Sequence, residues 1–414
     1  MTIEQQPERL VDQHVNGIIE HGFVWCTVGA SNAQSNYENM RRQMDTARAM
    51  EDVAFVLSEV EELTPAQTAM VAINANIAVA GTDKDASEVM PQKLTMEEFK
   101  QGSMAAVVAT AKGFSAMWEQ VLSNLHSITT LNKAAKVKLD MLLEQLKRQQ
   151  AQTDTLALST QEQVIELGEI PSILRIHAIK ESDDYLKELQ QCRTNFNALL
   201  QNTTVKCATS VRTLVHDGMT VFKTHSTRAA LEGLKEHRRS FSALPLRVAT
   251  EDVQTSADGL VIDVVLTGGY ALATDTDEDI PQLMKLAELE MATEAHTLVG
   301  ASIFADLIAE AEANIETLAL STGAANVLSD ATLAEEVKSF GDTVESILAA
   351  LPVLSNTKDV VFGYCDLFLD AVHVANSEIS FMTYMTRFIV AYTELLEYVA
   401  NKVQQANPDQ NPGL

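Results

Sequence analysis

A long apolar stripe between Thr95 and Gln150 constrains the fold more strongly than any other part of this chain. Thr95 is followed three residues later by Glu98, the spacing of a capping box at the start of a helix. Apolar residues then recur every three or four positions, which is the period of one helix face. They are Met104, Val107, Val108, Ala111, Phe114, Trp118, Val121, Leu122, Leu125 and Ile128 and, after a polar interruption that includes Asn132, Ala135, Leu139, Leu142, Leu143 and Leu146. One long helix or two in tandem would carry this stripe, and only partner helices could cover it.

The composition agrees with a mainly α fold built from bundles of long helices. Glycine (17) and proline (9) are scarce in 414 residues, whereas residues that favour helices are plentiful. With 46% apolar and 21% charged residues, the chain has the composition of a soluble globular protein and is long enough for two or three domains. We expect an N-terminal helical region, a central helical bundle, a connector, a C-terminal helical bundle and a flexible tail, at 1–94, 95–243, 244–278, 279–406 and 407–414.

The helical pattern is interrupted within the N-terminal region. A helix is expected from Glu8 to Glu20, followed by a loop that contains Gly22 and Gly29 and extends to 36. Trp25 in this loop is interpreted as a small anchor. A second helix is expected from Tyr37 to Leu63, where apolar residues again recur at helical spacing.

The connector breaks the helical pattern more completely. Residues 244–270 are rich in β-branched side chains and contain the pairs Asp258-Gly259 and Gly268-Gly269, which mark turns. A short β hairpin is one interpretation of this segment, and an irregular connector between two helical domains is the other. Helix is expected to return from Asp279 to Ala319, and the last long helix from Asp359 to Gln405.

Acidic residues give the chain a net charge of −27. Such a chain is unsuited to binding DNA along its length by neutralising phosphates, so DNA would be held weakly if at all. A basic cluster, formed by Lys235, Arg238, Arg239 and Arg247 around Phe241, could contact nucleic acid. The alternative is that this cluster pairs with acidic helices of the same chain. The acidic remainder of the chain is expected to serve solubility or to match a basic protein partner. Self-association is a further expectation.

The motif search predicts no enzyme site, no metal and no cofactor. The sequence has no H-E-x-x-H or phosphate-binding glycine motif. Asp275, Asp277 and Asp279 have the spacing that starts a calcium-binding loop, but Ile280 replaces the required glycine and Leu286 the required glutamate. The four cysteines form no C-x-x-C pair and are expected to be reduced thiols. No small-molecule substrate and no membrane-spanning segment are expected.

One part of the central stripe is a candidate interaction face. Its members lie on one side of the predicted helix and include two large aromatic side chains. They are Phe114, Met117, Trp118, Val121 and Leu125. The other interpretation is that these residues form buried helical core.

The segment from Ala49 to Leu125 resembles a known family. It reads AMEDVAFVLSEVEELTPAQTAMVAINANIAVAGTD, then SEVMP, then a helix that contains AMWEQVL. This order of an acidic helix, a T-P start, a polar loop and a long helix with tryptophan is similar to internal head (inner capsid) proteins of large tailed bacteriophages. The resemblance implies a virion structural protein that is made in the host cytoplasm, is packed inside the phage head and contacts capsid or other virion proteins.

The same resemblance implies a processing site. Such head proteins often lose a propeptide by cleavage after a small or aliphatic residue, any residue and glutamate, and Ala49, Met50 and Glu51 fit this form. Two other functions remain open. One is a soluble helical adaptor or regulatory protein-binding module of a phage or bacterium, and the other is an enzyme with a dispersed site, which would need a deep pocket with convergent carboxylates or histidines.

Overall fold

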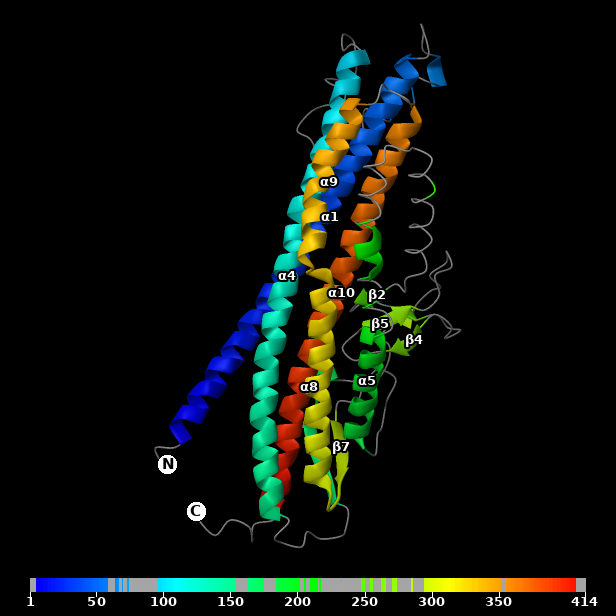
Figure 1. Cartoon of the computed structure of the whole chain (residues 1–414). Coiled ribbons are helices and arrows are strands. Elements are labelled where there is room, and N and C mark those ends of the chain that lie inside the picture. Colours follow the sequence, from blue (N-terminus) through cyan, green and yellow to red (C-terminus); the bar gives the residue numbers. More distant parts are fainter. Residues whose placement is uncertain are drawn as a thin grey trace.

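The computed structural model of the chain describes residues 5–58, 64–66, 69, 73, 96–153, 163–174, 184–201, 205, 209–214, 216, 232, 247–249, 254–255, 262–265, 270–273, 284–285, 294–350 and 355–406. Three long helices and a tandem pair form an elongated bundle (Figure 1). They are α1 (Gln5–Ser58), α4 (Met96–Thr153), the pair α8 (Ile303–Leu328) and α9 (Ala331–Ala350), and α10 (Ser355–Ala406). The mainly α fold expected from the sequence is confirmed.

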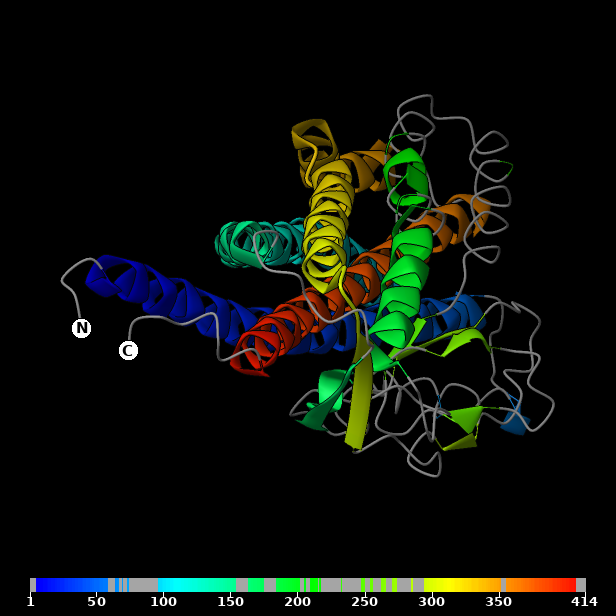
Figure 2. The same cartoon turned by 90° about the horizontal axis from the view of Figure 1, so that it is seen from below.

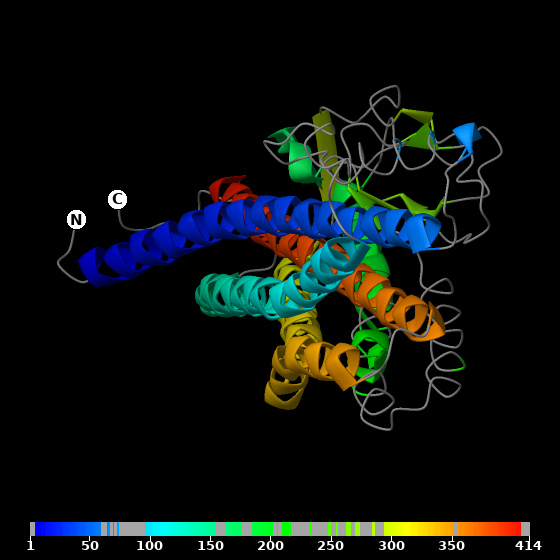
Figure 3. The ribbon, with the colours of Figure 1, turned by 90° about the horizontal axis from the view of Figure 1, so that it is seen from above.

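The directions of α1, α4, the tandem pair and α10 alternate along the chain, so that each runs antiparallel to the one before it. Contacts between α4 and α10 join Lys138 to Glu394 and Gln145 to Asn401, so these two helices are parallel. The pair Lys112–Glu345 in α9 and the pair Lys147–Glu312 in α8 show that α4 runs antiparallel to the tandem helices. Seen along the bundle axis, α4 lies among the others, and it contacts α1, α8, α9 and α10 (Figures 2 and 3).

Helix α4 is a single helix of 58 residues, about 87 Å long at 1.5 Å per residue. Its apolar stripe is covered by the partner helices, as its period requires. The polar interruption of the stripe does not break the helix. Buried Asn132 donates to Ser321 Oγ (3.1 Å) and Thr322 Oγ1 (3.2 Å) of α8 and accepts from Thr386 Oγ1 (2.6 Å) of α10. The buried side chain of Asn132 therefore has hydrogen-bond partners, as is usual for buried polar groups.

Helix α1 is also continuous, so the predicted loop between Gly22 and residue 36 is wrong. Two of its glycines lie where α1 approaches α4: a Cβ at Gly22 would be 3.0 Å from Leu131 Cδ1, and one at Gly29 would meet the amide of Asn124. Glycine lowers helix propensity, but here it permits close packing between two helices. Toward its N-terminus α1 then diverges from α4, and its N-terminal end extends beyond the other helices (Figures 1 and 3).

The tandem helices α8 and α9 meet at Ser329 and Asp330. The Asp330 carboxylate accepts a hydrogen bond from the backbone N–H of Thr332 (2.8 Å), which caps the start of α9. This bond lowers the pKa of Asp330, and Arg212 at 3.4 Å acts in the same direction. The break therefore has its own cap and does not interrupt the packing on α4.

One hydrophobic core joins all of these helices. Phe340 of α9 stacks on Phe368 of α10 with ring centroids 4.1 Å apart, and Phe114 of α4 meets Phe340 edge-on at 5.6 Å. A second aromatic cluster joins α5 (Tyr185–Leu199) to α10, where Phe196 and Phe388 lie 4.8 Å apart. Segments that the sequence assigns to a central and a C-terminal bundle thus share a core.

The small β element expected near 244–270 is confirmed. Strands β2 (Arg247–Ala249), β5 (Tyr270–Ala273) and β4 (Ile262–Val265) form an antiparallel sheet in that order. A further short pair joins β3 (Gln254–Thr255) to β6 (Met284–Lys285).

A second ribbon was not expected. Strand β1 (Gln163–Glu169) pairs antiparallel with β7 (Glu294–Val299), with a bulge at Leu167 that is followed by Gly168, whose φ of 69° suits glycine. The short η1 turn (Ser172–Leu174) follows β1. Because β6 and β7 occupy part of 279–302, the predicted helix from Asp279 is wrong there, and the helix begins at Ile303.

Candidate functional site

The predicted interaction face on α4 lies inside the protein. Phe114, Met117, Trp118, Val121 and Leu125 are all between 0% and 4% exposed. They pack against the neighbouring helices of the bundle, so the buried-core interpretation of this stripe describes the structure. A surface for partners must be sought elsewhere.

The predicted processing site lies within α1. Ala49, Met50 and Glu51 are part of the continuous helix, and Ala49 is buried. Just before them, buried Met44 and Ala47 anchor α1 in the core, and Arg48 pairs with Asp366 of α10. Cleavage after Glu51 remains a prediction, and in the folded bundle the released segment would stay attached by these contacts.

Several other candidate residues lie outside the described residues. These are the aspartates of the calcium-like run at 275–279, the basic residues at 235–239 with Phe241, the predicted helix cap Thr95, and Cys207. Cys365 and His373 lie eight residues apart on α10 but do not form a nucleophilic Cys–His pair. Cys365 is buried, whereas His373 is exposed and stacks on Tyr37 of α1 with ring centroids 4.9 Å apart.

A groove of about 640 Å³ lies between α1 and the middle of α4. None of its lining residues is Asp, Glu, Lys or Arg. The α1 side contributes Gln13, His14, Gly17, Ile18, His21, Gly22 and Trp25, and the α4 side contributes His126, Ser127, Thr130 and Leu131. We call this surface the α1/α4 groove.

Large apolar side chains are exposed along the same part of α1. Trp25 is 69% exposed, Val24 60% and Val28 48%. From Gln13 to Tyr37 the only acidic or basic residue, apart from two histidines, is Glu20. Charge depletion combined with exposed aromatic and aliphatic side chains is typical of the centre of a protein–protein interface.

The exposed side chains follow a heptad-like spacing. His14, Ile18, His21, Trp25 and Val28 are separated by four, three, four and three residues, so they share one face of α1. The opposite face packs on α10, where Arg387 lies over the Phe23 ring at 5.0 Å and donates to Thr27 Oγ1 at 2.7 Å. Helix α1 therefore has one face fixed in the bundle and another directed to its outside.

Chemically, the α1/α4 groove offers apolar contacts, small hydroxyl groups and imidazoles. In the part of the chain that the structure describes, no group of three or more His, Cys, Asp or Glu side chains is arranged to hold a metal ion. Within the same residues, no helix has an apolar stretch that could cross a membrane. The arrangement is suited to receiving another helix.

The described cysteines are buried thiols. Burial raises the pKa of Cys26, raises that of Cys192 to about 12 and raises that of Cys365 further. A thiol held protonated is a poor nucleophile and a poor metal ligand. These three cysteines therefore act as core residues.

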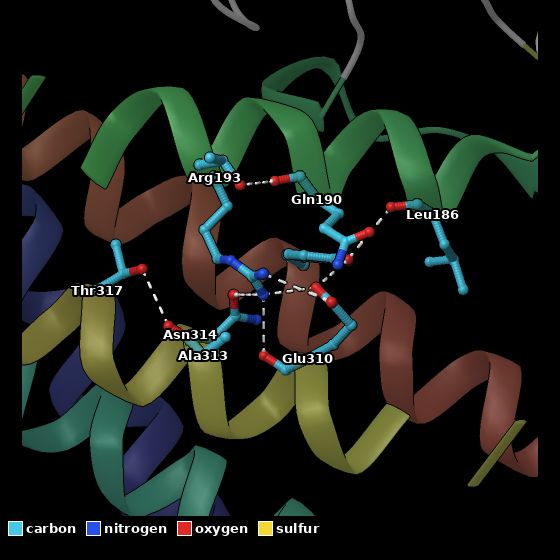
Figure 4. A network of polar contacts seen from close by, with 9 residues as sticks. Leu186, Gln190, Arg193, Glu310, Ala313, Asn314 and Thr317 are labelled. Atoms are coloured by element: carbon cyan, nitrogen blue, oxygen red, sulfur yellow. Dashed lines mark hydrogen bonds and ion pairs between the residues drawn. The ribbon is translucent and has the colours of Figure 1, made fainter. Parts of the chain in front are cut away.

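The most buried ionic network lies between α5, α8 and α10 (Figure 4). Arg193 of α5 contacts Glu310 of α8 through both terminal nitrogens of its guanidinium group, Nη1 to Oε2 at 2.5 Å and Nη2 to Oε1 at 3.5 Å. Tyr392 of α10 donates to Glu310 Oε2 at 2.9 Å. Arg193 Nη1 also donates to the Glu310 carbonyl at 3.2 Å. Arg193 Nη1 also donates to Asn314 Oδ1 at 3.5 Å, and the buried Nδ2 of Asn314 has no hydrogen-bond partner among the described residues. Because the network joins three helices, we interpret it as structural.

Sequence reasoning missed the α1/α4 groove because it placed Trp25 in a loop. Two signals in the sequence could have located it. One is the heptad-like spacing from His14 to Val28, and the other is the near absence of charge between residues 13 and 37. No protein-family model, curated protein or solved structure matches this chain.

Proposed function

We propose that this chain is a non-enzymatic structural protein inside a bacteriophage head, where it contacts the capsid shell, other virion proteins or its own copies through helix faces. The observation that carries this proposal is the α1/α4 groove. A surface without Asp, Glu, Lys or Arg, bordered by exposed Trp25, stands out on a chain with a net charge of −27. Such a surface can bury apolar area against another protein without desolvating charge.

The framework behind the groove supports a mechanical role. Helix α1 is held by buried residues such as Met44 and by interhelical pairs such as Arg48–Asp366, while toward its N-terminus it diverges from α4 (Figure 1). A partner bound to the open face of this N-terminal part is thereby connected to a bundle whose helix α4 is about 87 Å long. The resemblance of residues 49–125 to internal head proteins supplies the setting of the phage head.

Quantitative mass spectrometry of purified phage particles tests this proposal. Many copies per DNA-filled particle are expected, and the same peptides should define any new N-terminus after Glu51. A chain that begins at Met1 in the particle would contradict processing but not the head location. Absence from both filled and empty heads would contradict the head location and favour the soluble adaptor.

A further inference from the structure

We propose that the α1/α4 groove binds the α1 helix of a second copy of this chain, in an antiparallel arrangement with twofold symmetry. This inference names the partner of the surface used in the proposed function and rests on that function. It concerns the purified chain, so it can fail while the protein is still found in phage heads.

Charge selects a second copy as the occupant. Two chains with net charge −27 repel each other over most of their surfaces. The segment from Gln13 to Tyr37 carries only Glu20 as a formally charged residue, and the α4 wall of the groove, with His126 and Leu131, adds none. Two copies can meet on this part of the described surface with little repulsion, and burying its exposed apolar side chains removes apolar area from water.

The spacing on α1 suits pairing with itself. In a twofold interface, residue i of one copy contacts residue j of the other and the reverse contact also forms. The exposed face runs from His14 to Val28, about 21 Å of helix, and His21 is at its midpoint. When two such faces lie antiparallel about His21, Ile18 of each copy lies opposite Trp25 of the other. Ile18 and Trp25 then each gain an apolar neighbour, as in knobs-into-holes packing, while Val28 lies opposite His14.

The floor of the groove permits close approach. Gly17 lines it, and a Cβ placed on Gly17 would have no heavy atom within 4 Å. The internal packing of the chain therefore leaves room above Gly17, and a second helix can approach the α1 backbone there. A large side chain at this position would occupy the space that the partner helix needs.

Sedimentation velocity over a range of protein concentrations tests the proposal. A reversible dimer is expected at micromolar concentration. Trp25→Ser should weaken it by roughly 30-fold or more, because a central tryptophan commonly dominates an interface. Val164→Ser is the matched control, since Val164 of β1 is also a large apolar residue that is 61% exposed, and it does not line the groove. It should leave the dimer unchanged.

A glycine pair tests the geometry independently. Gly17→Leu should also abolish the dimer. Gly323→Leu, at an exposed glycine of α8 whose Cβ position is likewise open, should not. Both variants keep the helices of the monomer, which circular dichroism can verify.

Tryptophan fluorescence reports the same event without mutation of the groove. Trp118 is 2% exposed, so its emission should not change with concentration, whereas Trp25 at 69% should shift to shorter wavelength as the dimer forms. A chain that stays monomeric at all concentrations would overturn the proposal. So would a dimer that is insensitive to both Trp25→Ser and Gly17→Leu.

Discussion

Arg193 of α5 and Glu310 of α8 form an ion pair whose side chains are only 7% and 13% exposed. The pair fixes a short helix onto two long ones, because Tyr392 of α10 shares the same carboxylate. Such a pair brings little net stability over apolar residues of similar shape, but removal of one member leaves the other buried without its counterion. Removal of either member is therefore expected to cost more than removal of an exposed ion pair.

Arg193→Met is predicted to destabilise the protein by about 3–5 kcal/mol, because Glu310 would remain buried and charged. Urea denaturation followed by circular dichroism measures this loss. The control is Lys147→Met, which removes the partner of Glu312 only two residues further along α8. That pair is 54% exposed on both sides, so its loss should cost less than about 1 kcal/mol. Equal effects of the two variants would contradict the structural role of the buried pair.

Tyr392 should make the free energy of unfolding fall at alkaline pH. Burial raises the pKa of its phenol well above the usual value of 10.0, and the Glu310 carboxylate raises it further. The unfolded chain loses this proton near pH 10, while the native protein keeps it. The stabilisation is thus complete below pH 10 and is lost as the pH rises toward the native pKa. Above pH 10, stability should fall more steeply for the wild type than for Tyr392→Phe. Parallel curves for the two proteins would show that Tyr392 does not contribute.

Two glycines on the tandem helices should respond differently to alanine. A Cβ at Gly341 of α9 would lie 2.8 Å from Lys112 Cα of α4, so one backbone must move, and the expected loss is about 1–3 kcal/mol. Gly323 of α8 faces open space, and Gly323→Ala should be neutral or stabilising by up to about 1 kcal/mol. Thermal unfolding compares the two variants. If Gly341→Ala were as stable as Gly323→Ala, the close packing of α9 on α4 would be incorrect.

The buried thiols should resist modification. Cys26, Cys192 and Cys365 are buried, and each pKa is raised by burial. An alkylating reagent at neutral pH should therefore leave these three unlabelled in the native protein and label them fully in denaturant. Peptide mass spectrometry assigns the label to each position. Rapid native labelling of Cys365 would show that α10 is more open than described.

Much of the bundle could be predicted because period alone marks a buried helix face. The stripe on α4 and the dense apolar pattern of α10 did so. Period does not identify the partner of a face. It therefore could not show that α4 and α10 lie parallel with Lys138 beside Glu394, or that Asn132 is buried among hydroxyl groups from two other helices.

The errors have local physical causes. Gly22 and Gly29 were interpreted as loop residues because glycine weakens helices, whereas their role is close contact with Leu131 and Asn124. The β1–β7 ribbon was missed because its strands are short and far apart in sequence, with Gln163 opposite Val299. The groove was missed because of the first error: Trp25 belongs to an exposed helix face only if α1 is continuous.

Oxidative footprinting of intact phage particles would test most directly whether the α1/α4 groove binds another protein in the particle. Trp25 and Trp118 are the two tryptophans of the chain, and Trp118 serves as an internal control because it is 2% exposed. We predict that Trp25 is oxidised readily in the dilute free protein and is protected in the particle, while Trp118 is protected in both. Equal oxidation of Trp25 in the free protein and in the particle would contradict the account.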